Sequence, residues 1–460
     1  MAVIFRLWLC DNLNKVKLIN ILLAANLLLL LFLGGRLVFK FPIWSPIDEG
    51  SHFNYIQFIA ENRKLPILQQ DYASWQVLAI AEGIYPQMTT LNPSAIGLGG
   101  YLYEAFQPPL YYAASVPAFL LGGSNFIHKV LGIRAQDLII LLATLIFCWK
   151  FAARVFKDKR KRAAFRIVSC FFFLMPGLVL RNVTVSNAIL EFALSAVLFY
   201  LLLVKENLWW AAVTLGLLFL SRFTGIFLYG IFGLALAAKF LKELSAQKSS
   251  KIVLFPKFMI LAAIPLFMLV PWFQFNRAHF GTTTANELSK EMQKSLVNPD
   301  DKDYGLKDLI PMTDTLMDTF FLPEEWGIHE GVPITWATIF FKVLVFFVVL
   351  PTSIILVAIS AAKERGKALG KMIAATWEKN KPLIVSTAWI LLNILMLYVI
   401  IVGENWPTRI GRYLYPSVVP LIYLTTEAGD FLLTERGKRI LLLLAEAFAL
   451  MVWAGIAVYC

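Results

Sequence analysis

The sequence has little charge, few cysteines and few histidines for its length. Only 16% of its 460 residues are charged and 59% are hydrophobic, a balance too apolar for a soluble chain of this size. The four cysteines form no Cys-x-x-Cys pair, so they indicate neither a disulfide framework nor a zinc site. The four histidines include no His-Glu-x-x-His, which excludes the common zinc-protease motif.

The chain also lacks internal repeats, coiled-coil heptads and low-complexity linkers. Its N-terminal apolar run is too long for a signal-peptide core and no small-residue cleavage site follows, so we expect it to be retained. The net charge of +12 does not indicate nucleic acid, because excess Lys and Arg in membrane proteins gather in cytoplasmic loops. The composition predicts a polytopic membrane protein.

Apolar stretches of bilayer length predict an all-α fold with about eleven transmembrane helices. We place them at about Leu18–Phe39, Gly132–Val155, Ala163–Leu180, the run ending at Val204, Leu208–Leu220, Phe223–Ala238, Phe258–Phe275, Ile334–Ala361, Leu383–Val402, the run from Tyr413, and a last one ending at Cys460. Tyr111–Leu121 is apolar but too short to cross. We expect an interfacial or partly inserted helix there.

Basic stretches set the predicted orientation. Lys157–Arg162, Lys239–Lys257 and Lys363–Lys381 are all rich in Lys or Arg, which favours the cytoplasm. The opposite loop, residues 276–333, has eleven acidic residues against five basic ones. These stretches fall on one side only if Tyr111–Leu121 does not cross. We expect a multi-pass protein of the inner or plasma membrane with a cytoplasmic N-terminus and its active site on the outer face.

Three regions follow from this topology. Residues 1–275 form a predicted catalytic transmembrane module that includes a first outer loop over residues 40–131. Residues 276–333 form a second large outer loop, and residues 334–460 form a C-terminal transmembrane module. Loops of this length usually carry function or helices of their own, so we expect interfacial helices in both outer loops.

Two adjacent carboxylates, Asp48 and Glu49, follow the first predicted span. A carboxylate at this position could act as general base toward an acceptor hydroxyl, and we take Asp48 as the reacting group with Glu49 beside it in the catalytic site. The alternative is a pair of solvated carboxylates, or a cap for the amphipathic helix expected at Asn54–Ala60.

His52 lies four residues after Asp48, so the two side chains could share one helical face. An Asp-x-x-x-His pair could bind a metal, but no third ligand is near in the sequence. A divalent metal is therefore possible without support from ligand spacing. We expect no other cofactor.

Arginines on the predicted outer face are candidate anion ligands, because a guanidinium suits phosphate recognition. Arg222 lies between two short spans, where an ionised side chain usually faces an interior or a cavity. Arg409 and Arg412 are three residues apart among aromatic residues. The alternative for each is a side chain that snorkels at a helix end, and Tyr111 could equally belong to an aromatic interface belt.

Four short motifs resemble the GT-C class of glycosyltransferases, which use polyprenyl-phosphate-linked sugars. The likeness is nearest to the bacterial branch related to protein O-mannosyltransferases and lipid A aminoarabinose transferases. The motifs occur in the family's order and all on the predicted outer face, at Pro46–Ile56, Gln107–Tyr112, Val185–Ala188 and Gly411–Pro416.

The resemblance implies that Asp48 is the catalytic carboxylate and that basic residues, best represented by Arg222 and Arg412, hold the donor phosphate. Two positions depart from the family pattern. Asn187 stands where a second acidic residue is expected, with Glu191 one turn later, and Gln107 replaces the lysine of some relatives.

The resemblance thus predicts an inverting glycosyltransferase with a polyprenyl-phosphate-sugar donor. Its acceptor would be a hydroxyl of a glycan, lipid or protein, with membrane lipids as surroundings and no nucleic acid as partner. The alternatives are a flippase or transporter for a lipid-linked glycan, and an oligosaccharide ligase or polymerase. A transporter would favour paired repeats and broken midplane helices, neither of which the sequence shows clearly.

Overall fold

The computed structural model of the chain describes residues 12–44, 48–68, 70–71, 74, 77, 102–245, 251–283, 344–364, 369–403 and 411–434. Every regular element in these ranges is helical, so the all-α prediction is confirmed for the described chain. Apolar residues of bilayer length form helices because a chain in lipid must satisfy its backbone hydrogen bonds internally.

The elements, in chain order, are α2 (Asn12–Lys40), α3 (Glu49–Asn62), η1 (Tyr103–Phe106), α6 (Leu110–Leu121), α7 (Phe126–Val155), α8 (Lys159–Phe173), α9 (Pro176–Val183), α10 (Ala188–Tyr200), η2 (Leu201–Lys205), α11 (Leu208–Ser221), η3 (Phe223–Phe227), α12 (Leu228–Ser245), α13 (Lys251–Phe280), η7 (Leu344–Val349), α17 (Leu350–Lys363), α18 (Leu369–Gly403), η8 (Gly411–Ser417) and α19 (Val418–Leu432).

Six helices of the described chain are long and apolar enough to cross a membrane, or seven if α8 and α9 count as one span. The chain is therefore a multi-pass membrane protein. Shorter apolar helices occur at α6, α11 and α17. The total of about eleven spans stays a prediction, because the expected last span lies outside the described residues.

One predicted span needs correction. The sequence predicts a single helix over Ala163–Leu180, but α8 and α9 are bent by 66° at the break between them. Pro176 begins α9, and proline lacks the N–H that would continue the hydrogen bonds of α8. The bend places α9 and the residues after it beside the end of α2, which α9 contacts.

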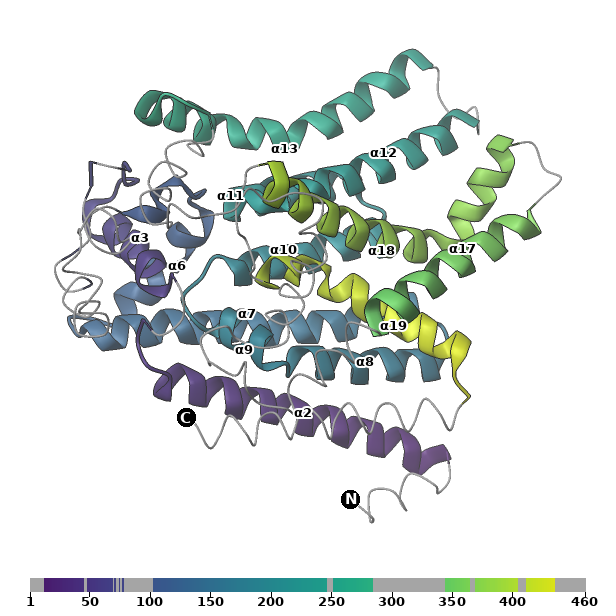
Figure 1. Cartoon of the computed structure of the whole chain (residues 1–460), viewed down its shortest axis with the longest axis horizontal. Helices are drawn as coiled ribbons and strands as arrows, with labels where there is room; N and C mark the ends of the chain where they lie inside the picture. Colours follow the sequence, from purple (N-terminus) through teal and green to yellow (C-terminus); the bar gives the residue numbers. More distant parts are fainter. Residues whose placement is uncertain are drawn as a thin grey trace.

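The long helices run roughly side by side (Figure 1). The ends of α7, α12 and α17 lie toward the right of the view, and α3 and α6 lie at the left. We call the right-hand end the basic end, because Lys157–Arg162 lead into α8 there and α12 ends there with Lys239 and Lys242. Its side of the membrane stays a prediction.

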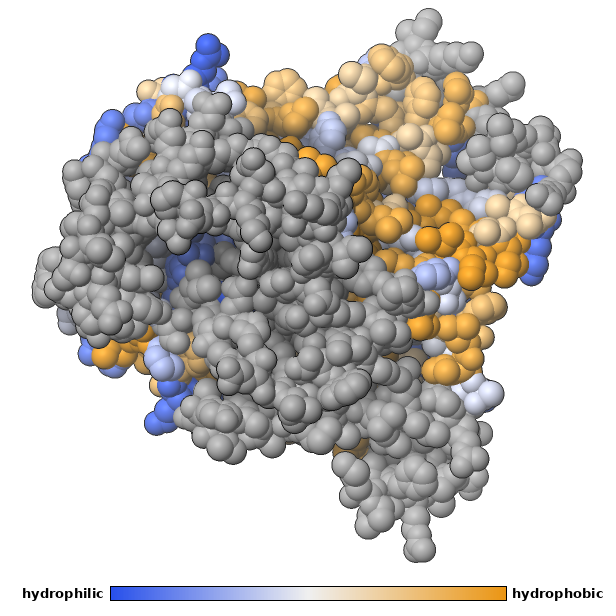
Figure 2. All heavy atoms as spheres, viewed as in Figure 1, coloured by the Kyte–Doolittle hydropathy of each residue, from blue (hydrophilic) through white to orange (hydrophobic). Residues whose placement is uncertain are grey.

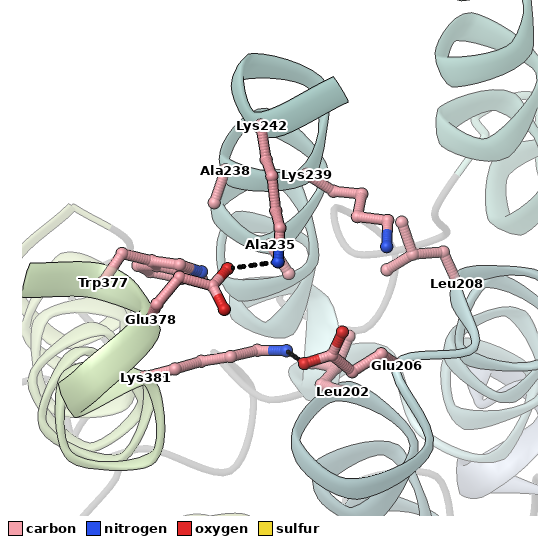
Figure 3. A pocket seen from close by; sticks show the side chains of 10 residues that line it. All are labelled: Leu202, Glu206, Leu208, Ala235, Ala238, Lys239, Lys242, Trp377, Glu378 and Lys381. Atoms are coloured by element: carbon pink, nitrogen blue, oxygen red, sulfur yellow. Dashed lines mark hydrogen bonds and ion pairs between the residues drawn. The ribbon is translucent and has the colours of Figure 1, made fainter. Parts of the chain in front are cut away.

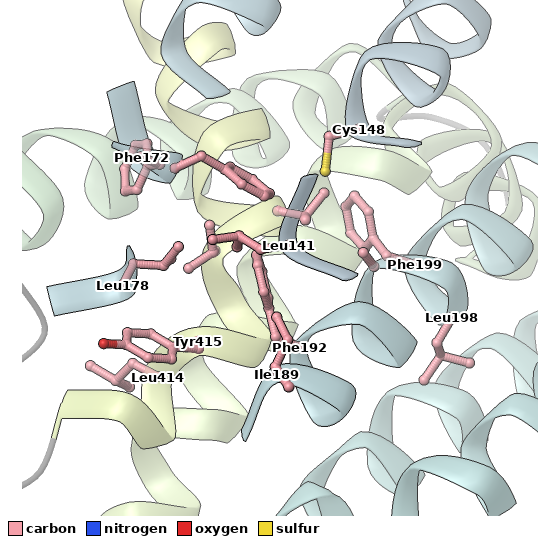
Figure 4. Close-up of a cluster of buried hydrophobic side chains, with 14 of the residues drawn as sticks. Leu141, Cys148, Phe172, Leu178, Ile189, Phe192, Leu198, Phe199, Leu414 and Tyr415 are labelled. Atoms are coloured by element: carbon pink, nitrogen blue, oxygen red, sulfur yellow. The ribbon is translucent and has the colours of Figure 1, made fainter. Parts of the chain in front are cut away.

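The core lies where α7, α8, α9, α10 and η8 meet. Buried apolar side chains from these elements pack together, among them Leu141, Phe172, Leu178, Phe192 and Tyr415 (Figure 4). Apolar side chains also cover much of the visible outer surface toward the right of the view (Figure 2). Exposed apolar residues of this kind suit contact with lipid chains.

Candidate active site

Asp48 stands at the start of α3 in a backbone conformation that L-residues rarely adopt. Its φ is 69°, and its side chain makes no N-cap hydrogen bond. A left-handed residue costs about 1–2 kcal/mol, and Asp tolerates it better than most. The helix-cap interpretation of Asp48 is therefore wrong, although the predicted helix after it is confirmed as α3. Strained residues of this kind cluster at functional sites.

In Glu49, the next residue, both carboxylate oxygens accept hydrogen bonds. Its Oε1 accepts from Arg134 Nε at 2.7 Å and from the Val185 N–H at 3.1 Å. Its Oε2 accepts from the Arg134 guanidinium at 2.6 Å and from the Trp44 N–H at 3.1 Å. Both side chains of the ion pair are 0% exposed. A buried carboxylate with four donors is a fixed anion.

Arg134 also ties down the chain as it leaves α2. Its guanidinium donates to the carbonyl oxygens of Phe41 at 2.8 Å and Pro42 at 3.1 Å. These two residues directly follow α2, and the guanidinium also reaches the Val38 carbonyl in the last turn of the helix at 3.4 Å, where a helix leaves acceptors unpaired. One arginine of α7 thus fixes the backbone on the N-terminal side of Asp48, while its partner Glu49 fixes the C-terminal side.

Tyr111 joins α6 to α7 and to the segment between α9 and α10. Its hydroxyl donates to Asp137 Oδ2 at 2.7 Å and accepts from the Ser186 N–H at 3.1 Å. Tyr111 is 1% exposed, so it is a core residue and not part of an interface belt. It positions the residue immediately before Asn187.

Asn187 in turn brings two motifs together. Its side-chain amide donates to Gln107 Oε1 at 3.4 Å and to the Ser221 carbonyl at 3.3 Å. Gln107 precedes α6, and Ser221 ends α11. The amide at Asn187 therefore binds an uncharged partner at Gln107, and the resemblance leads us to expect an acid at the first position and, in some relatives, a lysine at the second. Both departures from the family pattern occur at this one contact.

Arg222 follows Ser221 and is held on two sides. Its guanidinium lies 3.3 Å from Glu191 Oε2 and 4.5 Å from the centre of the Tyr413 ring. Glu191 also accepts from the Thr224 hydroxyl at 3.0 Å. Arg222 Nε is buried and finds no hydrogen-bond acceptor in the described part of the chain. The cation is thus oriented and retains one donor for a further anion.

His52 lies in a separate aromatic and acidic cluster. Its Nδ1 is 2.9 Å from the Tyr112 hydroxyl, and its Nε2 is 3.9 Å from Glu104 Oε1. Tyr55 stacks on Tyr112 with ring centres 3.9 Å apart. Burial, and then the charge of Glu104, raise the pKa of Tyr55 far above its usual value, so its phenol stays protonated and donates to the Gln107 carbonyl.

The structure brings together most of the predicted site residues. Glu49, His52, Gln107, Tyr111, Asn187 and Arg222 are linked through the contacts above, and Asp48 adjoins Glu49. Arg409 lies outside the described residues. Arg412 is the second residue of η8, but its side chain lies outside the described part of the chain, and its neighbour Tyr413 packs against Arg222.

Sequence reasoning missed Arg134, Asp137 and Glu104. The first two lie within the predicted span Gly132–Val155, where an ionised side chain signals a buried partner. Their spacing of three residues places them on one side of α7. Among the residues that the structure describes, no three His, Cys, Asp or Glu side chains gather as metal ligands.

Comparisons with known proteins found distant likenesses of fold. No protein-family model and no curated protein matches the chain. Two oligosaccharyltransferase structures from Archaeoglobus fulgidus match the chain. The first, of AglB, has 12% identity and a TM-score of 0.46, and the second, of an apo form, has 13% and 0.45. Each match covers 94% of this chain and 54% of the other, so the chain spans about half the length of the archaeal enzyme.

A third match is ArnT from Cupriavidus metallidurans bound to undecaprenyl phosphate, at 12% identity and a TM-score of 0.38, covering 88% of this chain and 77% of that one. At these scores and identities the likeness assigns no activity, which has to be argued from the residues themselves.

Proposed function

We propose that the chain is an integral-membrane glycosyltransferase that moves a sugar from a polyprenyl-phosphate donor to an acceptor hydroxyl. The observation that carries the proposal is the meeting of four motifs that are far apart in the sequence. Glu49 accepts from Val185, Tyr111 binds Ser186, Asn187 binds Gln107, and Arg222 stacks on Tyr413. Helix packing alone would not bring together the four motifs on which the sequence resemblance rests.

Asp48 is the general base of the proposed reaction. It is partly buried, whereas Glu49 is fully buried among four donors. Asp48 takes the proton from the acceptor hydroxyl as the oxygen attacks the anomeric carbon, and the bond from that carbon to the phosphate oxygen breaks. A single base with a phosphate leaving group fits one displacement with inversion.

Glu49 is a positioning residue in this proposal and not a second catalytic acid. Its carboxylate is neutralised by Arg134 and fixed by two backbone amides, so it has no capacity left for an incoming proton donor. Its effect on the reaction passes through Asp48, whose backbone it holds in the left-handed conformation.

Arg222 stabilises the leaving phosphate in the proposed reaction. Glu191 and Tyr413 hold its guanidinium in place, so little reorganisation is needed when charge develops on the phosphate oxygen. Its unpaired Nε supplies a donor. Arg412 lies one residue from Tyr413 in the sequence, which favours a second cation at the same phosphate. Its placement is part of the proposal.

The test is transfer by the purified full chain in liposomes that contain a polyprenyl-phosphate-linked hexose or aminosugar. Released polyprenyl phosphate is measured. Asp48→Asn is expected to lower the rate by about a hundredfold or more, while thermal unfolding and binding of polyprenyl phosphate remain those of the parent protein.

Glu61→Gln is the matched control, because Glu61 is an exposed carboxylate at the other end of the same helix α3. It is expected to leave the rate unchanged. Near-normal turnover by a folded Asp48→Asn variant would remove Asp48 from the mechanism. Absence of polyprenyl phosphate release by the parent protein with every donor tested would count against the whole proposal.

A further inference from the structure

A pocket opens at the basic end of the molecule, between the end of η2, the start of α11, the end of α12 and α18 (Figure 3). The pocket is open to solvent and is not an enclosed cavity. It lies at the opposite end of α10 and α11 from Glu191 and Arg222. The proposed transfer reaction makes no use of it.

Two ion pairs frame this pocket. Lys242 of α12 contacts Glu378 of α18 at 2.8 Å, and Lys381 of α18 contacts Glu206 at 2.8 Å. Each pair joins two different elements, so the two together fix three lining segments around one opening. Figure 3 shows both pairs with their charged ends turned toward the pocket.

Lys239 is the third lysine of the lining and takes part in neither of these two ion pairs. Its side chain extends toward Leu208 in Figure 3, away from the two ion pairs. Within the described part of the chain, no carboxylate comes within ion-pair distance of its ammonium group. Three lysines against two glutamates leave the lining with one excess positive charge.

The backbone beneath the pocket is irregular. α10 ends in a π-helical turn, η2, and Glu206 follows it with a φ of 49°. π-helical turns and left-handed residues other than glycine both occur preferentially at functional sites. Here the irregularity turns Glu206 toward Lys381 and leaves the mouth of the pocket open beside Lys239.

The charge of Glu206 is secured by its surroundings. Burial would raise the pKa of its carboxyl, but the hydrogen bond and charge of Lys381, followed by the charges of Lys239 and Lys242, hold that pKa below its usual value. Glu206 therefore stays ionised and keeps Lys381 in place. The field that acts on it comes from all three lysines of the lining.

We propose that this pocket binds a phosphate group, carried either by the headgroup of an anionic lipid or by a soluble phosphate ester. Lysine binds phosphate as a point charge, and Lys239 supplies the unpaired one. Trp377 lines the same pocket, and tryptophan favours the level of the lipid headgroups. A phosphate seated here contacts segments of both α12 and α18 and ties their ends together.

The test uses native mass spectrometry of the purified full chain, released from nanodiscs of phosphatidylglycerol mixed with phosphatidylcholine. A second arm adds inorganic phosphate to protein in neutral detergent and measures thermal unfolding. Lys239→Ala is expected to lower the apparent affinity for the phosphate group by about tenfold. The loss appears as less retained phosphatidylglycerol in the first arm, or as a smaller shift of the unfolding temperature by phosphate in the second. Lys239→Arg is expected to retain binding.

Lys205→Ala is the matched control. Lys205 is an exposed lysine at the end of η2, next to Glu206 in the sequence, but does not line the pocket. If Lys239→Ala loses the bound phosphatidylglycerol and Lys205→Ala keeps it, the lipid is the source of the phosphate. A phosphate-dependent shift without enrichment of that lipid identifies a soluble ester.

Equal loss in the two alanine variants, or no response of the parent protein in either arm, would overturn the pocket as a specific site. Unfolding and lipid retention are measured without any transfer assay. Failure here is therefore distinguishable from failure of the proposed function.

Discussion

The two ends of the helix bundle use the same kind of ion pair in opposite surroundings. At the α3–α6 end, Arg134 and Glu49 are each 0% exposed. At the basic end, Lys242 and Glu378 are 53% and 52% exposed. Buried charges must be paired and fully hydrogen-bonded to persist, whereas exposed pairs are screened and contribute little.

The difference in exposure between these ion pairs indicates which end of the bundle is rigid. Separating Arg134 from Glu49 would leave two buried charges unpaired, so the segments that they join are held in one arrangement. The Lys242–Glu378 pair at the basic end is exposed on both sides and can open with little loss of free energy, so Lys242 is able to accept a ligand. The α3–α6 end suits chemistry that needs fixed geometry, and the basic end suits reversible binding.

The largest expected effect is that of breaking the buried pair. Arg134→Met leaves Glu49 as an uncompensated buried anion, which is expected to cost about 3–5 kcal/mol of folding free energy. Thermal unfolding in detergent measures it. Adding Glu49→Gln to the same chain is expected to recover part of the loss. A double variant no more stable than Arg134→Met would show that the two side chains are not coupled.

The second buried pair is expected to be weaker. Glu191→Gln removes the carboxylate beside Arg222, but Tyr413 still stacks on the guanidinium and the ion-pair distance is 3.3 Å. We expect a loss of about 3 kcal/mol, the low end for a broken buried pair, together with slower release of polyprenyl phosphate. Loss of stability with an unchanged transfer rate would separate Arg222 from the phosphate.

A single hydroxyl tests the link between α6 and α7. Tyr111→Phe leaves Asp137 and the Ser186 N–H without their shared partner, and is expected to cost about 1–3 kcal/mol. The phenyl ring stays packed, so the change isolates the hydrogen bonds. Unfolding in detergent gives the value, and Tyr229→Phe, whose hydroxyl donates to the single Ala262 carbonyl, is the control for a lost phenol.

The smallest effect is expected at the basic end. Lys242→Ala breaks an exposed pair and should change the free energy of unfolding by about 0–1 kcal/mol. In high salt, the free energies of unfolding of the parent and the variant should differ even less, because salt screens exposed charges. A loss as large as that of Arg134→Met would erase the distinction between the two ends.

Much of this arrangement follows from the sequence, and the limits have physical causes. Apolar length predicts the long helices, and the amphipathic pattern predicts α3. Pro176 indicates the bend between α8 and α9, but the prediction of one helix over Ala163–Leu180 did not take it into account. Asp48 stands out because it follows a span directly. Arg134 escaped notice because it is embedded in apolar residues, and local spacing cannot reveal a partner 85 residues away.

The Glu49 cluster also bears on how the protein is made. Arg134 leaves the ribosome 85 residues after Glu49, and Val185 leaves it 136 residues after. Until α7 has been inserted, the turn between α2 and α3 has no cation to hold it. Nascent chains stalled before α7 should therefore be cleaved readily by protease at this turn, and those stalled after α9 should resist. Resistance before α7 is made would show that the turn forms without Arg134.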